Sequence, residues 1–319
     1  MVKISVCVPT FNSAKFIRET IESVLNQTYQ DFELLIVDDY SKDETLDIVQ
    51  SIKDARIRIF KNEKNLGMVR NFNRCLELAQ GEFVTTLDGD DLMASSNLQQ
   101  KIDLLEKYPE MAFVFSNVDI IDESSHVTGS RPKKPLPFSS RMVSDAICVA
   151  GGIVFKTLLI EGNFICKSSV ILRRNLLERF GSFNVQFSWG EDYDMWARMA
   201  LSHEVGYVQQ PLVKYRIHTE NYTKDFTQEK KIQGKEQMAL VQRTLLHRYF
   251  ATGNTLLTVK ELVVVYQEML YVYFVQNRFR LVRKIVYEAM GHGVRKFHIL
   301  KYYLLSWFPL GVINWLRKI

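Results

Sequence analysis

The sequence predicts an α/β protein with a mostly parallel sheet covered by helices on both faces, followed by a helical C-terminal extension. Apolar, β-branched runs alternate with helical patterns over the first 120 residues, and such alternation is typical of βαβ units. From about residue 226 onward the periodicity is helical. The 319 residues, 47% of them apolar and 24% charged, suit one large domain or one domain with an extension.

The expected elements of the N-terminal part follow one another in alternation. Strands are expected at 4–9, 32–39, 57–62, 82–88 and 111–121, and helices at 14–28, 42–53 and 67–80. The second helix carries a capping-box pattern, in which Ser41 opens the helix and Glu44 follows three residues later. Gly81 is expected to end the third helix.

The pattern loosens beyond residue 121. The further expected elements are an extended basic loop at 131–137 ("RPKKPLP"), a strand and a helix within 163–183, a helix with an acidic start at 190–203, and a pair of strands within 205–218. The stretch 125–165 matches no motif. The expected organisation is a domain of residues 1–225 followed by a helical region of residues 226–319.

Cysteine spacing and the N-terminal sequence indicate a cytoplasmic protein. The cysteines are far apart and form no C-x-x-C pair, so neither a zinc site nor a disulfide framework is expected. The N-terminus runs directly into a strand and lacks the apolar core and cleavage site of a signal peptide. No apolar run reaches the roughly 20 residues that span a bilayer.

The net charge of +5 is concentrated in the C-terminal tail. Residues 278–319 hold nine Lys and Arg against one acid, Glu288, a net +8 that leaves −3 for the rest of the chain. The segment 294–319 is aromatic and apolar with basic ends, which favours peripheral contact with a membrane surface. Packing against the N-terminal domain or a second subunit is the open alternative. Binding of nucleic acid, which needs basic residues interleaved with aromatics on an exposed face, is less favoured.

The expected strand at 82–88 ends in three carboxylates within "LDGDD", at Asp88, Asp90 and Asp91. Hard divalent cations prefer carboxylate oxygens, and crowded carboxylates repel one another unless a cation neutralises them. Gly89 between them lets a bulky ligand approach the backbone. The spacing therefore predicts a metal site at this strand end.

The same acids have a simpler interpretation. Asp91 or Ser95 could cap the helix that begins near Asn97. Asp38 and Asp39 also end a strand, and because ligands of parallel sheets bind beyond the carboxyl ends of the strands, both acidic clusters are expected at one edge.

These residues resemble the motifs of family 2 glycosyltransferases with the GT-A fold. The matching pieces occur in order: "VCVPTFN" (6–12), "IESVLNQTYQDFELLIVDDYSKDET" (21–45), "NLGMVRNFNRCLELAQGEF" (65–83), "LDGDD" (87–91), "GEDYDMWARM" (190–199) and "YRIH" (215–218). The resemblance implies a Rossmann-like GT-A catalytic domain at 1–225, with a nucleotide-binding half at about 1–120 and an acceptor-side half at about 121–225.

The resemblance also implies roles for individual residues. The nucleotide-binding residues would be Pro9, Phe11, Asp39, Arg70 and Asp88, the metal ligands Asp88, Asp90 and His218, and the catalytic residues Asp192, as general base, and Glu191. Acids are also favoured at a helix start by the helix dipole, so a simple capping role stays open for Glu191 and Asp192. Asp194, in the same turn, is a second candidate for the base. Arg70 could instead be an ordinary residue on a helix surface, and His218 an ordinary surface or core histidine.

The implied activity is metal-dependent, inverting transfer of a sugar from a nucleotide-diphosphate sugar to a hydroxyl of a saccharide or lipid-linked acceptor, in surface polysaccharide or glycolipid synthesis. The cofactor would be Mn²⁺ or Mg²⁺, and UDP is the family's commonest nucleotide, with dTDP and GDP open. A nucleotide-cofactor oxidoreductase is disfavoured, because the turn after the first strand, "PTFNSAK", lacks its glycine-rich loop. A sugar-nucleotide nucleotidyltransferase and an inactive binding protein of the same fold remain alternatives.

Overall fold

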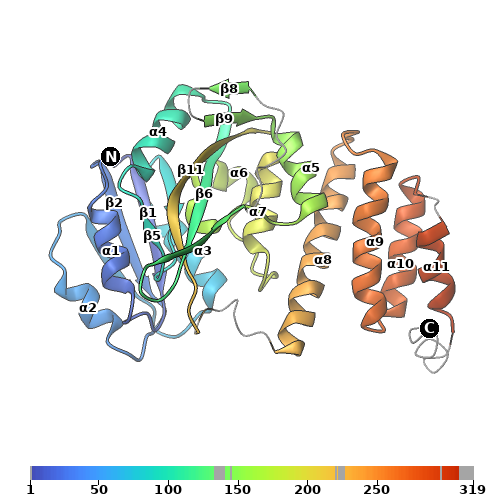
Figure 1. Ribbon diagram of the computed structural model, residues 1–319, viewed down its shortest axis with the longest axis horizontal. Coiled ribbons are helices and arrows are strands. Elements are labelled where there is room, and N and C mark those ends of the chain that lie inside the picture. Colours follow the sequence, from blue (N-terminus) through green and yellow to red (C-terminus); the bar gives the residue numbers. More distant parts are fainter. Residues whose placement is uncertain are drawn as a thin grey trace. The chain divides into compact units, whose positions relative to one another are not determined.

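The computed structural model describes residues 2–132, 141–143, 146–219, 221, 227–294 and 297–308, without the side chains of 141–143, 146–148, 228–229 and 297–298 (Figure 1). The chain divides into two compact units, residues 1–158 with 163–225 and residues 159–162 with 226–319. The first unit holds a mixed sheet with its helices, and the second is helical. The predicted fold class is confirmed.

One sheet runs through the first unit in the order β3-β2-β1-β4-β10-β6-β11-β9-β8, with β5 paired to β11 and β7 to β6. The strands are β1 (Ile4–Thr10), β2 (Phe32–Asp38), β3 (Ile57–Lys61), β4 (Phe83–Thr86), β5 (Leu92–Met93), β6 (Met111–Ile121), β7 (Val127–Arg131), β8 (Arg141–Val143), β9 (Ala146–Val149), β10 (Ile171–Arg173) and β11 (Glu204–Arg216). The block β3-β2-β1-β4 is parallel, and so is the pair β6 and β11. β10 runs antiparallel between β4 and β6 and joins the two parallel parts.

Helices cover both faces of the parallel block. Every position of β1 and β2 is buried, which explains their nearly unbroken apolar runs. The alternate residues Ile4, Val6 and Val8 share one core with α1 (Ile17–Leu25), α2 (Thr45–Ser51) and α4 (Asn97–Lys107). On the opposite face, α3 (Met68–Leu78) packs on β1 and β2, where Cys75 and Cys7 are both fully buried.

The loops after β1 and β2 are fastened to each other at the carboxyl edge of the sheet. The backbone N–H of Asn12 donates to Ser41 Oγ at 2.9 Å, and the N–H of Ser13 donates to Thr45 Oγ1 at 2.7 Å. The predicted capping box was therefore wrong: the Ser41 hydroxyl is used by Asn12, α2 begins at Thr45, and Glu44 makes no capping bond. The tertiary contact outcompetes the local cap.

Two further expectations are corrected. The strand pair expected within 205–218 is a single strand, β11, in which register shifts at Val208, Pro211 and Val213 take up the irregularity. The helix near Asn97 has Ser96 as its N-cap residue without a side-chain bond, so neither Asp91 nor Ser95 caps it. Of the basic loop expected at 131–137, Arg131 ends β7 and residues 133–137 lie outside the described residues.

The unassigned stretch 125–165 contains a helix, α5 (Gly151–Glu161). Gly151 starts it against the backbone of residues 200–203, since an added Cβ would lie 1.6 Å from the carbonyl oxygen of His203. The remaining elements of the first unit are the short 3-10 turn η1 (Lys167–Ser169), α6 (Leu176–Phe180) and α7 (Glu191–Ala200).

The second unit consists of α8 (Gln228–Ala251), α9 (Val259–Val275), α10 (Phe279–Gly291) and α11 (Phe297–Leu305), which pack side by side (Figure 1). α9 begins with a capping box between Thr258 and Glu261. Among the described residues, no helix is long and apolar enough to cross a membrane.

Candidate active site

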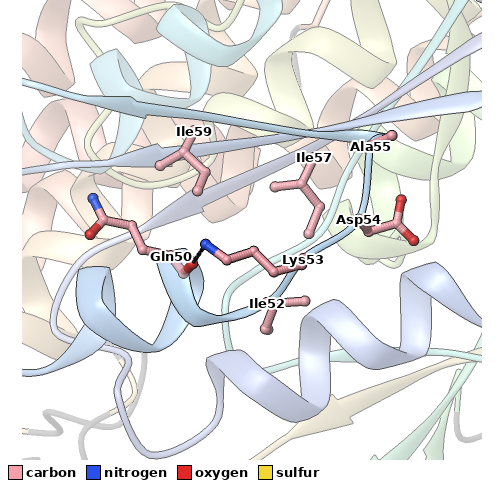
Figure 2. A pocket seen from close by; sticks show the side chains of 7 residues that line it. All are labelled: Gln50, Ile52, Lys53, Asp54, Ala55, Ile57 and Ile59. Atoms are coloured by element: carbon pink, nitrogen blue, oxygen red, sulfur yellow. Dashed lines mark hydrogen bonds between the residues drawn. The ribbon is translucent and has the colours of Figure 1, made fainter.

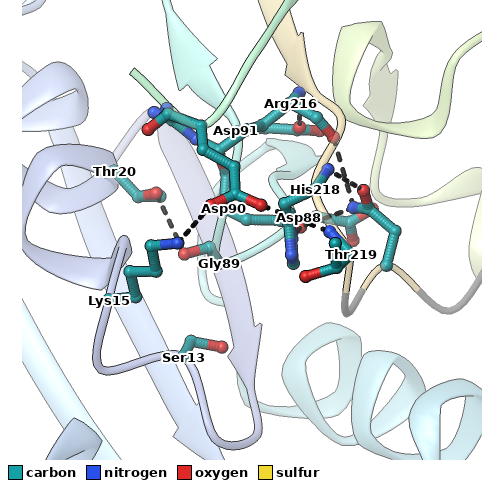
Figure 3. A network of polar contacts seen from close by, with 12 residues as sticks. Ser13, Lys15, Thr20, Asp88, Gly89, Asp90, Asp91, Arg216, His218 and Thr219 are labelled. Carbon is teal, nitrogen blue, oxygen red and sulfur yellow. Dashed lines mark hydrogen bonds and ion pairs between the residues drawn. The ribbon is translucent and has the colours of Figure 1, made fainter. Parts of the chain in front are cut away.

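The acids of "LDGDD" lie in the connection between β4 and β5, at the carboxyl edge of the parallel block (Figure 3). Asp88 and Asp90 keep 34% and 22% of their side chains exposed, whereas Asp91 is fully buried. Gly89 packs against the loop after β1, because an added Cβ would lie 3.2 Å from Ser13 Oγ. The three neighbouring acids therefore have different surroundings.

Asp91 is part of the framework of the site. Its Oδ1 accepts the backbone N–H of Arg216 at 2.9 Å, and its Oδ2 accepts the hydroxyl of Ser168 at 2.6 Å. Burial, with Asp90 and Asp88 close by, raises the pKa of Asp91 well above its ordinary value. This carboxyl ties the loop after β4 to the end of β11 and to η1.

Asp90 contacts the segment that follows β11. Its Oδ2 lies 2.8 Å from His218 Nε2 and accepts the Asn221 side-chain amide at 3.1 Å. The Arg216 guanidinium, itself fully buried, donates to the Asp90 carbonyl oxygen at 2.8 Å and to Glu19 Oε2 at 2.6 Å. The structure thus brings together two of the predicted metal ligands, Asp90 and His218.

One lysine links Asp88 to the acids at the start of α7, Glu191 and Asp192. Lys167 Nζ lies 3.8 Å from Asp88 Oδ1 and 3.3 Å from Glu191 Oε1, at the start of α7. Burial raises the pKa of Asp88, which Lys167 opposes and Asp90 adds to, although its exposed third lets solvent screen part of these effects. Burial disfavours the ammonium, but Asp88 and Glu191 outweigh burial and raise the pKa of Lys167.

Asp192 is held beside Glu191 by neutral hydrogen-bond donors. Its Oδ2 accepts the Asn163 side-chain amide at 2.9 Å, and its Oδ1 accepts the backbone N–H of Tyr193 at 2.7 Å. Burial raises the pKa of Asp192 to about 7; Glu191 adds to the effect and Lys167 opposes it. This carboxyl can exchange a proton near neutral pH.

Asp194, the second candidate for the base, is engaged in an ion pair within its own helix. It is fully buried, and its Oδ2 accepts Arg198 Nε at 2.8 Å within the same helix. Arg198 in turn donates to the Ser182 carbonyl oxygen at 2.9 Å and fastens the loop before α7. The first turn of α7 therefore carries one structural acid and two acids that face the site.

Asp39 organises the loop between β3 and α3. Its Oδ1 accepts the Asn62 side-chain amide at 2.9 Å and the N–H of Leu66 at 2.8 Å, and its Oδ2 accepts the N–H of Gly67 at 2.9 Å. Asn71 accepts the second N–H of the Asn62 amide at 2.8 Å. Asp39 thus holds the start of α3 at the carboxyl edge.

The other residues predicted to bind nucleotide lie around this edge. Pro9 is buried in β1, Phe11 is 47% exposed in the loop after it, and Arg70 is exposed in the first turn of α3. Asn12 and Tyr40, which follow β1 and β2, both have positive φ, +49° and +68°. Non-glycine residues in such strained conformations cluster at ligand sites.

Several residues of this network were missed from the sequence, above all Lys167, Asn163 and Ser168. They lie in the stretch "NFICKSSVIL", whose polar triplet interrupts an otherwise apolar run. That interruption is the available signal, but the partners of the triplet, Asp88 and Glu191 among them, are distant in sequence and come together only in the fold.

A buried lysine, Lys101, is hydrogen-bonded to η1, and its burial leads to a prediction about stability. Lys101 is fully buried, donates to the Ser169 carbonyl oxygen at 2.7 Å, and burial lowers its pKa to about 7. Below pH 7 the folded state carries the whole cost of a buried ammonium. Between pH 7 and the ordinary value of 10.5 the unfolded state binds more protons, so this cost falls by roughly 1.4 kcal/mol per pH unit.

Lys101→Met is therefore expected to raise the free energy of unfolding by a few kcal/mol at pH 6.5, less about 1 kcal/mol for the lost hydrogen bond. The gain should shrink toward zero by pH 9.5. Urea unfolding of both proteins at the two pH values measures it. A gain that does not change with pH would contradict the assigned cause.

Among the described residues, no group of three or more His, Cys, Asp or Glu side chains is placed to hold a metal ion. The site offers Asp90 and His218 in contact, with Asp88 two residues away. A shallow depression elsewhere, near β3, is lined by Gln50, Ile52, Lys53, Asp54, Ala55, Ile57 and Ile59 (Figure 2). It contains none of the acids described above.

Comparisons with known proteins identify the family. A family model for glycosyl transferase family 2 matches residues 5–162. The chain belongs to this family. An uncharacterised glycosyltransferase of Haemophilus influenzae is 26% identical over 310 residues, 94% of this chain and 91% of its own length. The family is thus one of enzymes that transfer sugars, and homologues act on nucleotide sugars.

A characterised relative and two solved structures extend the comparison. WfgD of Escherichia coli, a UDP-Glc:alpha-D-GlcNAc-diphosphoundecaprenol beta-1,3-glucosyltransferase, is 27% identical over 81% of this glycosyltransferase and 94% of WfgD. TarS 1–349 of S. aureus, solved with UDP-GlcNAc, superposes with a TM-score of 0.61 at 18% identity, covering 99% and 92% of the two chains. The mannosyltransferase PcManGT from Pyrobaculum calidifontis, solved with GDP-Man and Mn²⁺, gives 0.53 at 18% identity over 77% and 64%. The structural likenesses show a shared fold.

Proposed function

We propose that this glycosyltransferase moves a sugar from a nucleotide-diphosphate sugar to an acceptor hydroxyl with inversion at the anomeric carbon, and that Asp192 is the general base. The observation that supports this best is the bridge through Lys167, which contacts both Asp88 and Glu191. Lys167 joins Asp88, a proposed ligand of the donor, and the first turn of α7, which carries Asp192, in one network. That network lies at the carboxyl edge, where ligands of parallel sheets bind.

In the proposed reaction, Asp192 accepts the proton of the acceptor hydroxyl while the hydroxyl oxygen attacks the anomeric carbon. The new glycosidic bond forms as the bond between the anomeric carbon and the phosphate oxygen breaks on the opposite face. The nucleoside diphosphate leaves with the bonding electron pair. One base and one displacement imply inversion. A carboxyl with a pKa of about 7 suits such a base near neutral pH.

We propose that the nucleotide binds at the ends of β1 and β2, with Pro9, Phe11 and Arg70 around it. Asp39 accepts three hydrogen bonds, and an ionised carboxylate has about four lone-pair sites. One lone-pair site of this buried carboxylate is therefore left for the N3–H of uracil or thymine. UDP is the proposed nucleotide by analogy with WfgD.

We propose that Asp88, Asp90 and His218, whose side chains have the chemistry to bind a divalent cation, would hold Mn²⁺ or Mg²⁺ together with water and substrate phosphates, although the three are not placed as one ligand group before the cation binds. Asp90 and His218 are already in contact, and Asp88 is partly exposed on the same loop. A bound cation supplies charge stabilisation to the leaving diphosphate. A neighbour in fold was solved with Mn²⁺ and a nucleotide sugar.

We propose a saccharide or lipid-linked acceptor in surface polysaccharide synthesis, used at the cytoplasmic face of the membrane. The name of WfgD supports this, since its acceptor is a diphosphoundecaprenol. An aromatic face of the second unit, made of Tyr287, Tyr303, Leu304 and Trp307, would meet the lipid. Tyr287, Leu304 and Trp307 are 61%, 55% and 63% exposed, and the Arg283 guanidinium lies 4.3 Å from the centre of the Trp307 ring.

Aromatic residues combined with cations suit the interface of an anionic membrane, and the +8 charge of residues 278–319 complements it. The full chain is expected to float with vesicles rich in phosphatidylglycerol but not with phosphatidylcholine vesicles. Leu304→Ser with Trp307→Ser should weaken flotation severalfold, whereas Val127→Ser, an exposed apolar residue of the first unit, should not. Equal flotation of all variants would overturn the membrane contact; a dimer lost in the double variant would assign the face to a second copy of the chain.

The donor site is tested by calorimetric titration of UDP, dTDP and GDP with and without Mn²⁺. Binding of one nucleotide only with metal would support the donor site, and a sugar screen with that nucleotide would then test transfer. Tight binding with no transfer to any saccharide or lipid-linked acceptor would favour the inactive binding protein. Release of pyrophosphate from a sugar phosphate and a nucleoside triphosphate would favour the nucleotidyltransferase.

A further inference from the structure

The short turn η1 contacts both the acids of the loop after β4 and the acids at the start of α7. Lys167 reaches Asp88 and Glu191, and Ser168 accepts the backbone N–H of Asp88 at 3.3 Å while it donates to Asp91. Ser169, the next residue, accepts a hydrogen bond from Lys101 at its carbonyl oxygen. η1 is therefore a fixed point between the loop after β4 and the start of α7.

Lys167 is placed there with little freedom to move. Its side chain is only 10% exposed, and its Nζ lies 3.5 Å from the centre of the Phe72 ring, which covers it from α3. The two carboxylates approach at 3.3 Å and 3.8 Å. A long flexible side chain loses about 1.5–2 kcal/mol of rotamer freedom when it is fixed in this way, so its contacts must outweigh that cost.

The charges around Lys167 explain why a cation is needed. Asp88 and Asp90 lie on one side and Glu191 and Asp192 on the other, and like carboxylates repel one another in a buried setting. Around Asp192, Glu191 comes from α7, Asn163 from the segment after α5, and Lys167 from η1. Among these described neighbours Lys167 is the cation, and it is in contact with a member of each acidic group.

We infer that Lys167 is a positioning residue for sugar transfer: its ammonium holds the donor-side carboxylate of Asp88 and the base-bearing start of α7 at a fixed separation. The inference rests on the proposed function. Without the ammonium, Asp88 and Glu191 repel, and the spacing between donor and base widens. A misplacement of about 1 Å can cost on the order of 100-fold in rate. Affinity for the nucleotide with its metal should not fall, because the Lys167 ammonium competes with the proposed cation for the Asp88 carboxylate.

The experiment compares Lys167→Met and Lys167→Arg with wild type, and uses Lys3→Met as a matched control. Lys3 also pairs with two carboxylates, Glu82 and Glu106, both at 2.8 Å, but at the amino end of β1. Each variant is tested for kcat, KM, binding of UDP with Mn²⁺ by calorimetry, the pH profile of kcat/KM, and thermal unfolding. Wild-type transfer in the same assay tests the proposed function separately.

For Lys167→Met, kcat should fall about 10- to 100-fold with the dissociation constant of UDP and Mn²⁺ unchanged or lower. The acid limb of the pH profile should move to higher pH, since a cation that favours ionised Asp192 is gone. Lys167→Arg should recover part of the rate, and Lys3→Met should behave as wild type in all but stability. A folded Lys167→Met protein with wild-type kcat and pH profile would overturn the inference, and so would a loss of stability alone.

Discussion

Replacing Asp192 with Asn is expected to lower kcat by about 10²- to 10⁴-fold and to leave the binding of UDP and Mn²⁺ unchanged. The carboxylate that accepts the acceptor's proton is removed, while the amide keeps the shape of the side chain. The substituted side chain can still accept the N–H of Tyr193 through its amide oxygen, so α7 should start as before. Transfer rates and calorimetric binding on the same preparation measure the two quantities.

The pH dependence gives this prediction a second, independent measurement. The pKa of Asp192 is raised to about 7, and only the ionised carboxylate can accept a proton. In wild type, kcat/KM should therefore fall as the pH drops below about 7 and level off above it. In Asp192→Asn the residual rate should lack this limb. Asp103→Asn, an exposed acid on α4, is the control and should keep both the rate and the limb. A wild-type limb at the ordinary pKa of an aspartate would contradict the role.

The fold could be predicted because the signals that specify it are local. The apolar run of β6 predicts its bounds to the residue, and the alternation of strands and helices up to α4 predicts the parallel block. The short strand β10 lies within 163–183, where a strand was expected, but its antiparallel place between β4 and β6 could not be predicted, since it depends on pairing with segments far away in sequence. The same holds for Ser41, whose hydroxyl serves the loop after β1 in place of α2.

In the candidate site, too, some residues could be predicted from local sequence and others only from contacts between distant segments. Asp88 and Asp90 were predicted because acids gather at the end of one strand, and Asp192 because its segment resembles a motif of the family. Lys167 lies in none of the motifs, and Arg216 lies within "YRIH", but nothing local shows that Lys167 contacts Asp88 and Glu191 or that Arg216 contacts Asp90 and Glu19. Neutral side chains such as Asn163, which donates to Asp192, cannot be predicted from the sequence for the same reason. The structure therefore adds to the motifs the cations and amides that hold them in place.

Asp90→Asn is expected to abolish the metal-dependent part of nucleotide binding, and with it transfer. Asp90 is one of two partly exposed carboxylates on the loop after β4, and it faces His218. Replacing an anionic oxygen ligand by a neutral amide removes a full charge from the attraction for a divalent cation. Calorimetric titration of UDP should then give the same weak binding with and without Mn²⁺, whereas wild type should bind more tightly when Mn²⁺ is present.

Asp91→Asn is the matched control, because it makes the same chemical change one residue further along the chain. Asp91 is buried, with a pKa raised well above its ordinary value, so a neutral side chain already suits its place. An asparagine there can accept the N–H of Arg216 and donate to Ser168 Oγ, the two partners of the carboxyl. This variant should fold and keep Mn²⁺-dependent binding. If Asp90→Asn binds UDP and Mn²⁺ as wild type does while Asp91→Asn loses that binding, the metal belongs to the buried acid and the assignment to Asp90 is wrong.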